Sequence, residues 1–169
     1  VKDVLVTGAT GGVGSIAVMI LAKMGYNVHA VTGKKDKNDF LKKLGAKTII
    51  DRKELESESR PLDKGIWDGV VDTVGGKILA KAISHTKPNG IVAACGLAAD
   101  YKLNTTVMPF IIRGVKLWGI DSVMISKKRR EFIWSQVDNL VDFKLLEKYI
   151  KIVNLEELLD IFPKILKGE

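Results

Sequence analysis

A glycine-rich segment near the N-terminus is the strongest candidate for chemistry in this sequence. Residues 7–14 read Thr-Gly-Ala-Thr-Gly-Gly-Val-Gly, between an apolar strand pattern and a helical pattern. Glycine permits a tight turn and lets a ligand approach the backbone closely. The free amides and the dipole at the start of the following helix favour a negatively charged group. The segment therefore predicts a diphosphate-binding turn formed by Thr10, Gly11, Gly12, Val13 and Gly14.

The segment departs from the usual dinucleotide fingerprint at one position. Ala9 stands where G-x-G-x-x-G has its first glycine, and Gly8 precedes it. Gly14 is expected to let the helix pack closely on the strand. The competing interpretation is a tight strand–helix turn without a ligand, which this number of glycines in this context disfavours. The motif by itself does not identify a reaction.

The end of the second predicted strand indicates which dinucleotide is bound. Residues 32–35 read Thr-Gly-Lys-Lys, whereas an NAD site usually has an acidic residue at this point to bind the ribose hydroxyls. A hydroxyl group and cations suit a 2′-phosphate instead. We therefore predict NADP(H), held at this end by Thr32, Gly33, Lys34 and Arg52. The alternative is that Asp36 binds the ribose of NAD and that the lysines are only a solvated turn.

The apolar periodicity alternates between strand and helix along the chain, which predicts an α/β Rossmann fold with a parallel six-stranded sheet and helices on both faces. The expected strands are residues 4–7, 27–32, 48–50, 67–73, 91–95 and 115–120. The expected helices are residues 13–24, 39–44, 77–86 and 126 to about 143, with a turn at residues 88–90. Ser126 is expected to cap the helix that begins there. Asn154 and Glu157 predict a capping box for a last helix, which Pro163 should kink or interrupt.

Composition limits the classes of protein that this chain can belong to. Its 169 residues are enough for one domain, and the first residues, which lack an initiator methionine and begin at once with a strand, suggest an excised domain. No apolar run could cross a bilayer and no signal peptide is visible, so we expect a cytoplasmic protein without membrane contact. The single cysteine, Cys95, excludes an internal disulfide. We expect it to be a small buried side chain near the cofactor and not a nucleophile.

The net charge of +7 has a plain interpretation as a lysine-rich, solvated surface. No aromatic residues alternate with the basic ones, and no nucleic-acid-binding module is recognisable, so we expect no nucleic-acid partner. The run Lys127–Arg130 opens a predicted helix, where positive charge opposes the dipole. A solvated basic face is the favoured interpretation, and a phosphate of coenzyme A bound there is the alternative.

Two oxidoreductase families use a glycine turn of this kind. Short-chain dehydrogenases need a Tyr-x-x-x-Lys pair, in which the lysine lowers the pKa of the tyrosine so that it can exchange a proton. The chain has three tyrosines, and none is followed by a lysine four residues later. A short-chain dehydrogenase relative is therefore only a weak alternative.

Six stretches extend the comparison beyond the glycine turn. They are VTGATGGVG (6–14), FLKKLGA (40–46), VDTVGG (71–76) and, more specific, AVTGK (30–34), PFIIRGV (109–115) and LWGIDS (117–122). Together they resemble the cofactor domain of zinc-independent medium-chain dehydrogenase/reductases, in the quinone oxidoreductase branch. The resemblance is to the YhdH/YhfP type, which includes acrylyl-CoA reductases.

The resemblance implies NADPH-dependent reduction of an activated double bond in an enone, a quinone or an acyl-CoA. Hydride would reach the β-carbon and leave an enolate that needs a nearby donor. The nicotinamide end of the cofactor would meet residues that follow strand ends. These are Thr73, Val74, Gly96 and Leu97 at the ribose and Ile120 and Ser122 at the carboxamide.

The resemblance also implies partners for this domain. The catalytic residues are expected in an N-terminal GroES-like domain that precedes the cofactor domain in this family, and no metal site is expected here. The last strand, near Val115–Ile120, would pair with its copy across a two-fold axis and form a homodimer. A non-catalytic NAD(P)-binding sensor module is the alternative from a different functional class.

Overall fold

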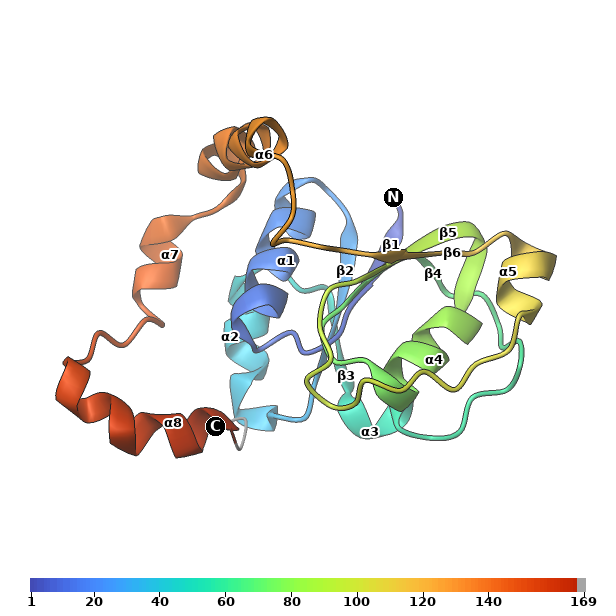
Figure 1. Cartoon of the computed structure of the whole chain (residues 1–169), viewed down its shortest axis with the longest axis horizontal. Helices are drawn as coiled ribbons and strands as arrows, with labels where there is room; N and C mark the ends of the chain where they lie inside the picture. The colour runs from blue at the N-terminus through green and yellow to red at the C-terminus, as the bar shows by residue number, and fades with distance from the viewer. Residues whose placement is uncertain (167–169) are drawn as a thin grey trace.

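The computed structural model describes residues 1–166, and its centre is one parallel sheet (Figure 1). The strands run in the order β3-β2-β1-β4-β5-β6, and every neighbouring pair is parallel. Their bounds are β1 (Asp3–Val6), β2 (Asn27–Thr32), β3 (Thr48–Asp51), β4 (Trp67–Asp72), β5 (Thr86–Ala94) and β6 (Lys116–Gly119). The predicted six-stranded parallel sheet is confirmed.

Helices cover both faces of the sheet, as predicted (Figure 1). One face carries α1 (Gly12–Lys23) and α2 (Asn38–Lys43), and the other carries α3 (Arg52–Leu55) and α4 (Gly76–Ser84). Side chains of a strand alternate between the two faces. Leu5 accordingly packs in the α3–α4 core, while its neighbour Val6 packs in the α1–α2 core. Apolar burial on both faces fixes the register of the central strands.

The C-terminal third of the chain adds helices outside this sandwich. After the short α5 (Met108–Arg113) and β6, the helices α6 (Lys127–Leu140), α7 (Phe143–Glu147) and α8 (Leu158–Leu166) follow. Figure 1 shows these three as an orange-to-red arc beside α1 and α2. Val141, between α6 and α7, is 7% exposed and packs in the α1–α2 core, so it anchors the arc to the sheet domain.

The segment Pro88-Asn89-Gly90 was predicted as a turn before the fifth strand, and this prediction was wrong. α4 ends at Ser84, and β5 already begins at Thr86. Trp67 pairs with Thr86 and Gly69 with Ile91, so residues 87–90 bulge out opposite Asp68. Asn89 adopts the left-handed conformation (φ 63°) that such a bulge requires.

Two expectations for the remaining helices need correction, and one helix was missed. The helix starting at Ser126 ends at Leu140, because α7 begins separately after Asp142, whose carboxylate accepts the Leu145 amide at 2.9 Å. α5 was not predicted. Pro163 does not interrupt α8, which runs from Leu158 to Leu166.

Two predicted capping interactions are confirmed. The Ser126 hydroxyl accepts the Arg129 amide, and Asn154 forms a capping box with Glu157 ahead of the short 3₁₀ turn η2 (Leu155–Glu157) that leads into α8. A second 3₁₀ turn, η1 (Lys35–Lys37), follows β2. Within residues 1–166, no helix is both long and apolar enough to span a membrane.

A polar network ties the amino-terminal ends of the strands together. The Asp3 carboxylate lies 3.2 Å from Nε2 of His29, accepts the Asn27 amide at 3.1 Å and lies 3.3 Å from Nζ of Lys87. Lys87 also pairs with Asp68 at 2.9 Å. The hydrogen bonds from His29 and Asn27 lower the pKa of Asp3 to about 2. The ionised carboxylate therefore stabilises this edge of the sheet.

We expect Asp3→Asn to destabilise the fold at pH 6 and to lose that effect in acid. The pKa of Asp3 is lowered from 3.8 to about 2 in the fold, so its contribution is complete above pH 4 and is lost as pH falls towards 2. Thermal melts of both proteins between pH 2.5 and pH 6 measure this difference. Asp39→Asn, on exposed α2, is the matched control. A difference that stays constant or grows in acid would contradict the role given to Asp3.

Candidate nucleotide-binding site

The glycine turn lies at the carboxyl end of β1, and two of its glycines have no room for a side chain. A Cβ on Gly14 would lie 2.2 Å from the carbonyl oxygen of Gly8. A Cβ on Gly8, whose φ is 58°, would lie 2.3 Å from Oγ1 of Thr73. Gly14 therefore allows the close approach of α1 to the turn, as predicted, and Gly8 allows the β4–α4 loop to touch the turn.

The start of α1 presents unpaired amides. Its N-cap, Gly11, provides no side-chain cap, and no acidic residue lies in the first turn. Within the described part of the chain, the amides of Gly12, Val13 and Gly14 have no hydrogen-bond partner. A Cβ on Gly12 would meet no atom within 4 Å, and Gly11 and Gly12 line a cavity, so the space beside Gly12 is open. Free amides at the positive end of a helix dipole fit an anionic phosphate.

The end of β2 joins this turn and carries cations. The Thr32 hydroxyl accepts the Lys34 amide at 3.0 Å and lies 3.4 Å from the Thr10 hydroxyl. The guanidinium of Arg52 lies against Gly33, because a Cβ there would be 3.5 Å from Cζ of Arg52. The structure thus brings Thr10, Thr32, Gly33, Lys34 and Arg52 into one corner. This corner suits an additional phosphate on an adenosine ribose.

Acidic residues also lie near this corner, and one of them was missed by sequence reasoning. Asp51 pairs with Thr32 across β3 and β2, but its carboxylate caps α3 by accepting the Lys53 amide at 3.0 Å. Arg52 Nε lies 2.9 Å from Glu56. Asp36, the alternative ribose ligand, is exposed and lies 3.5 Å from Nζ of Lys37. The sequence alone does not place Asp51 beside Thr32, because this contact follows from the pairing register of β3 with β2.

The residues predicted for the nicotinamide end gather at the carboxyl ends of β4, β5 and β6. Oγ1 of Thr73 donates to the carbonyl of Thr7 at 2.9 Å, and a Cβ on Gly96 would lie 2.3 Å from the Thr73 carbonyl. The loops after β1, β4 and β5 therefore meet at Thr73. Val74 packs against the α3–α4 core, and Leu97 is exposed.

Two further predicted residues follow β6. The Ile120 amide donates to the carbonyl of Ala94 at 2.9 Å, which holds Ile120 beside the end of β5. Ser122 is exposed, and its carbonyl accepts a hydrogen bond from Arg130 at 2.9 Å. Ile120 is thus fixed at the carboxyl edge of the sheet, while Ser122 lies in the following loop.

A cavity of about 370 Å³ opens beside the glycine turn. Its lining combines the turn with α1, α2 and the segment after α7: Thr10, Gly11, Gly12, Ser15, Ile16, Lys37, Phe40, Leu146, Tyr149 and Ile150. The rings of Phe40 and Tyr149, which both line the cavity, pack with centroids 4.4 Å apart. Sequence reasoning missed these aromatic residues because more than a hundred positions separate them and neither lies in a motif.

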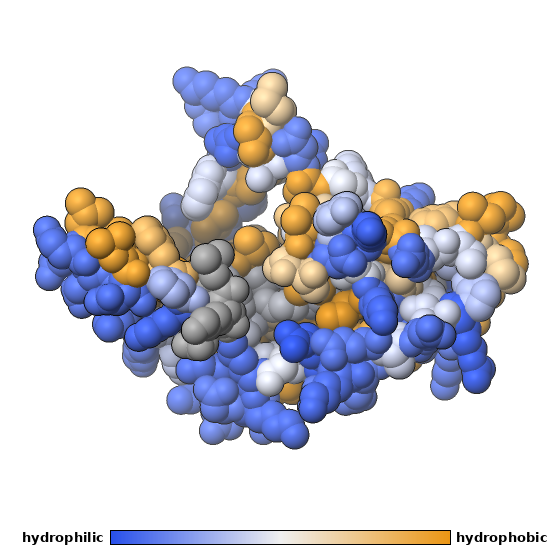
Figure 2. Space-filling view, turned by 60° about the horizontal axis from the view of Figure 1, so that its bottom comes forward, coloured by the Kyte–Doolittle hydropathy of each residue, from blue (hydrophilic) through white to orange (hydrophobic). Residues whose placement is uncertain are grey.

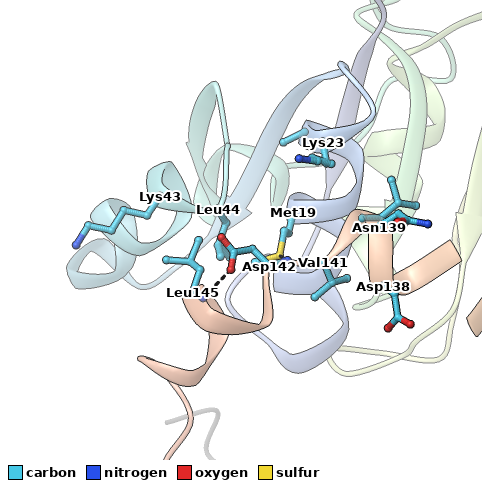
Figure 3. Close-up of a pocket in the computed structure, with 11 residues that line it drawn as sticks. Met19, Lys23, Lys43, Leu44, Asp138, Asn139, Val141, Asp142 and Leu145 are labelled. Atoms are coloured by element: carbon cyan, nitrogen blue, oxygen red, sulfur yellow. Dashed lines mark hydrogen bonds between the residues drawn. The ribbon is translucent and has the colours of Figure 1, made fainter. Parts of the chain in front are cut away.

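A second cavity, of about 400 Å³, lies between α1, α2 and the α6–α7 junction (Figure 3). Met19, Leu44, Val141 and Leu145 contribute apolar atoms, and lysines and aspartates stand at its rim. None of the residues predicted to bind the cofactor lines it. This cavity is therefore separate from the predicted cofactor residues.

Cys95 differs from its prediction. It follows β5 and is exposed instead of buried. Its Sγ lies 3.2 Å from the carbonyl oxygen of Asp72. Partial desolvation and the nearby Asp72 carboxylate raise the pKa of the thiol, which agrees with the prediction that Cys95 is not a nucleophile.

The fold and the site together define a dinucleotide-binding domain of the Rossmann class. The sequence model for the zinc-binding dehydrogenase family matches residues 12–139. This chain belongs to that family.

Individual relatives agree with this assignment. The chain is 46% identical over 167 residues, 98% of its length, to acrylyl-CoA reductase AcuI of Ruegeria pomeroyi. It is similar in structure to the YhdH oxidoreductase of Salmonella enterica in complex with NADP, with 45% identity and a TM-score of 0.94 over 99% of the chain. It also resembles YhfP of Bacillus subtilis with NAD bound, with 43% identity and a TM-score of 0.90 over 99% of the chain. The resemblance predicted from the six stretches is confirmed.

Two facts limit what the family name implies. The chain spans 51% of the length of each of these three relatives. The family is named for zinc, but residues 1–166 contain no group of three or more His, Cys, Asp or Glu side chains that could hold a metal ion. The described residues therefore do not fit a zinc centre.

Alanine substitutions at Gly14 and Gly12 test the packing constraint at the start of α1. We expect Gly14→Ala to destabilise the fold by about 1–3 kcal/mol, because its Cβ would meet backbone atoms that cannot move aside. Each kcal/mol lowers the melting temperature by about 2–4 °C in a domain of this size. Gly12→Ala, with open space in front of it, is the matched control and should melt as the wild type does. Equal melting of Gly14→Ala and wild type would refute the packing constraint.

Proposed function

We propose that this chain is the NADPH-binding half of a reductase that acts on activated double bonds. The observation that carries the proposal is the set of free amides at Gly12–Gly14 beside a β2 end that offers Lys34 and Arg52. The amides suit a diphosphate, and the cations suit a 2′-phosphate. A relative crystallised with NADP supports the same cofactor.

Each group of residues has a task in this proposal. NADPH supplies a hydride when it is bound. The glycine turn anchors the diphosphate, and Thr32, Gly33, Lys34 and Arg52 select the 2′-phosphate. Thr73, Val74, Gly96 and Leu97 orient the nicotinamide ribose, and Ile120 and Ser122 lie towards the carboxamide. Fixing the cofactor at both ends aligns its reactive carbon with a substrate.

The substrate class follows from the relatives. The proposed substrates are acyl-CoA esters with a conjugated double bond, enones or quinones, and a relative named acrylyl-CoA reductase supports the first. Hydride adds to the β-carbon, and a proton added to the α-carbon completes the saturated product. The group that stabilises the enolate belongs, in this proposal, to an N-terminal GroES-like catalytic domain.

The two alternative functions, a short-chain dehydrogenase relative and a non-catalytic sensor module, gain no support. The family match lies with zinc-binding dehydrogenases and not with short-chain dehydrogenases. No observation on the described residues favours a sensor module. A second relative crystallised with NADPH, YHDH of E. coli K-12, supports NADP(H) as the cofactor.

Lys34→Glu should weaken the binding of NADPH selectively. Calorimetric titration of this chain with NADPH and NADH measures the change. We expect NADPH to bind about 10- to 100-fold more weakly, because a charge-assisted contact of about 1.5–3 kcal/mol is lost. NADH, which lacks the 2′-phosphate, should bind as before. Lys43→Glu, an exposed lysine on α2, is the matched control and should change neither affinity. Tighter binding of NADH than of NADPH by the wild type would overturn the cofactor assignment.

We also propose that the chain forms a homodimer through β6. This strand is the last in the sheet order, so its outer edge offers unpaired backbone groups. Trp118 on β6 is 57% exposed, and Ile111 and Ile112 on neighbouring α5 are exposed as well. Figure 2 shows hydrophobic side chains gathered at the α5 end of the molecule. Pairing of two β6 strands would cover these groups.

The cytoplasmic location stays a prediction.

Trp118→Glu should convert the dimer into a monomer, because the new charges would repel each other across the two-fold axis. Sedimentation velocity at micromolar concentration measures the change, and the expected mass falls to half. Trp134→Glu on α6, a similarly exposed tryptophan, is the matched control and should remain dimeric. A wild-type chain that sediments as a monomer would contradict the proposed interface.

A further inference from the structure

A fully buried carboxylate lies behind the cofactor residues. Asp72 ends β4 and has no exposed surface. Its Oδ1 accepts the hydroxyl of Thr7 at 2.7 Å, and its Oδ2 accepts the amide of Gly75 at 2.9 Å. Burial raises the pKa of Asp72, and these hydrogen bonds oppose the rise. A buried carboxyl group is costly unless its hydrogen bonds are made, so its position calls for an explanation.

The two partners of Asp72 belong to different loops of the site. Thr7 is the first residue after β1 and leads into the glycine turn. Gly75 caps α4 with a φ of 73°, a conformation that the hydrogen bond from its amide to Asp72 helps to hold. Between Asp72 and Gly75 lie Thr73 and Val74, which the proposed function assigns to the nicotinamide ribose.

Further contacts make this junction rigid. The Thr7 hydroxyl accepts the Thr73 amide at 3.0 Å while it donates to Asp72, and Oγ1 of Thr73 donates back to the Thr7 carbonyl. Gly8 lies so close to Thr73 that no side chain fits between the loops. The distance between the glycine turn and the β4–α4 loop is therefore set by direct Thr7–Thr73 hydrogen bonds and by the Asp72 carboxylate, which binds Thr7 and Gly75 at once.

We propose that Asp72 is a positioning residue that sets the spacing between the diphosphate-binding turn and the loop at the nicotinamide ribose. The inference rests on the proposed function and adds to it. Asp72 does not touch the cofactor in this proposal. It acts through Thr7 and Gly75, so its effect should be confined to ligands that reach both loops.

Two ligands separate this role from a general effect on folding. NADPH reaches from the corner at Lys34 to the loop at Thr73, whereas adenosine 2′,5′-bisphosphate ends at the first phosphate. In Asp72→Asn, the new amide group cannot accept both hydrogen bonds. Calorimetric titration of this chain should show NADPH binding weakened about tenfold, the loss of one charge-assisted contact, and adenosine 2′,5′-bisphosphate binding unchanged within about twofold.

Two sets of variants control the test. Asp68→Asn makes the same change at the other end of β4. The affinities for NADPH and for adenosine 2′,5′-bisphosphate should both stay at the wild-type values. Thr7→Val removes the hydroxyl and should reproduce the pattern of Asp72→Asn, while Thr7→Ser keeps the hydroxyl and should bind NADPH as the wild type does. The Thr7 variants keep the test decisive if Asp72→Asn does not fold.

The outcomes separate this inference from the proposed function. Equal weakening of both ligands, or of neither, in Asp72→Asn and Thr7→Val would overturn the positioning role while the wild type still binds NADPH. A wild-type chain that binds neither ligand would overturn the proposed function and the inference with it.

Discussion

The close contact between Gly14 and the carbonyl of Gly8 is the constraint on which the rest of the site depends. It brings the first turn of α1 against the end of β1, where the amides of Gly12, Val13 and Gly14 have no hydrogen-bond partner among the described residues. A larger residue at Gly14 would push the helix away and disperse these donors. The same turn touches the β4–α4 loop through Gly8 and Thr73. One backbone packing arrangement thus sets both the anion site and its distance from the neighbouring loop.

The parallel direction of all six strands places the residues of the site at one end of the sheet. All six strands run the same way, so their carboxyl ends meet at one edge and carry the cations, the hydroxyls and the glycines of the site together. The opposite edge has a separate task, because the network of Asp3, Lys87 and Asp68 stabilises the fold there. Asp3, Lys87 and Asp68 can therefore be changed without touching the predicted cofactor residues, which lie at the other end of the strands.

Much of this could be predicted from the sequence because the signals are local. Continuous apolar runs predict buried parallel strands, and the glycines at 8–14 predict their own turn. Contacts set by strand pairing could not be predicted. Asp51 lies beside Thr32 only through the register of β3, and residues 87–90 look like a turn although they form a bulge in β5. Thr7 meets Asp72 across 65 positions, and Tyr149 reaches Phe40 across more than a hundred.

A crystal structure of this chain with NADPH tests the central claim most directly. The account expects the diphosphate within about 3 Å of the amide nitrogens of Gly12 and Val13, the distance of a hydrogen bond to nitrogen. It also expects the 2′-phosphate between Lys34 and Arg52. A cofactor bound elsewhere on the chain, or a diphosphate that makes no contact with the start of α1, would contradict it.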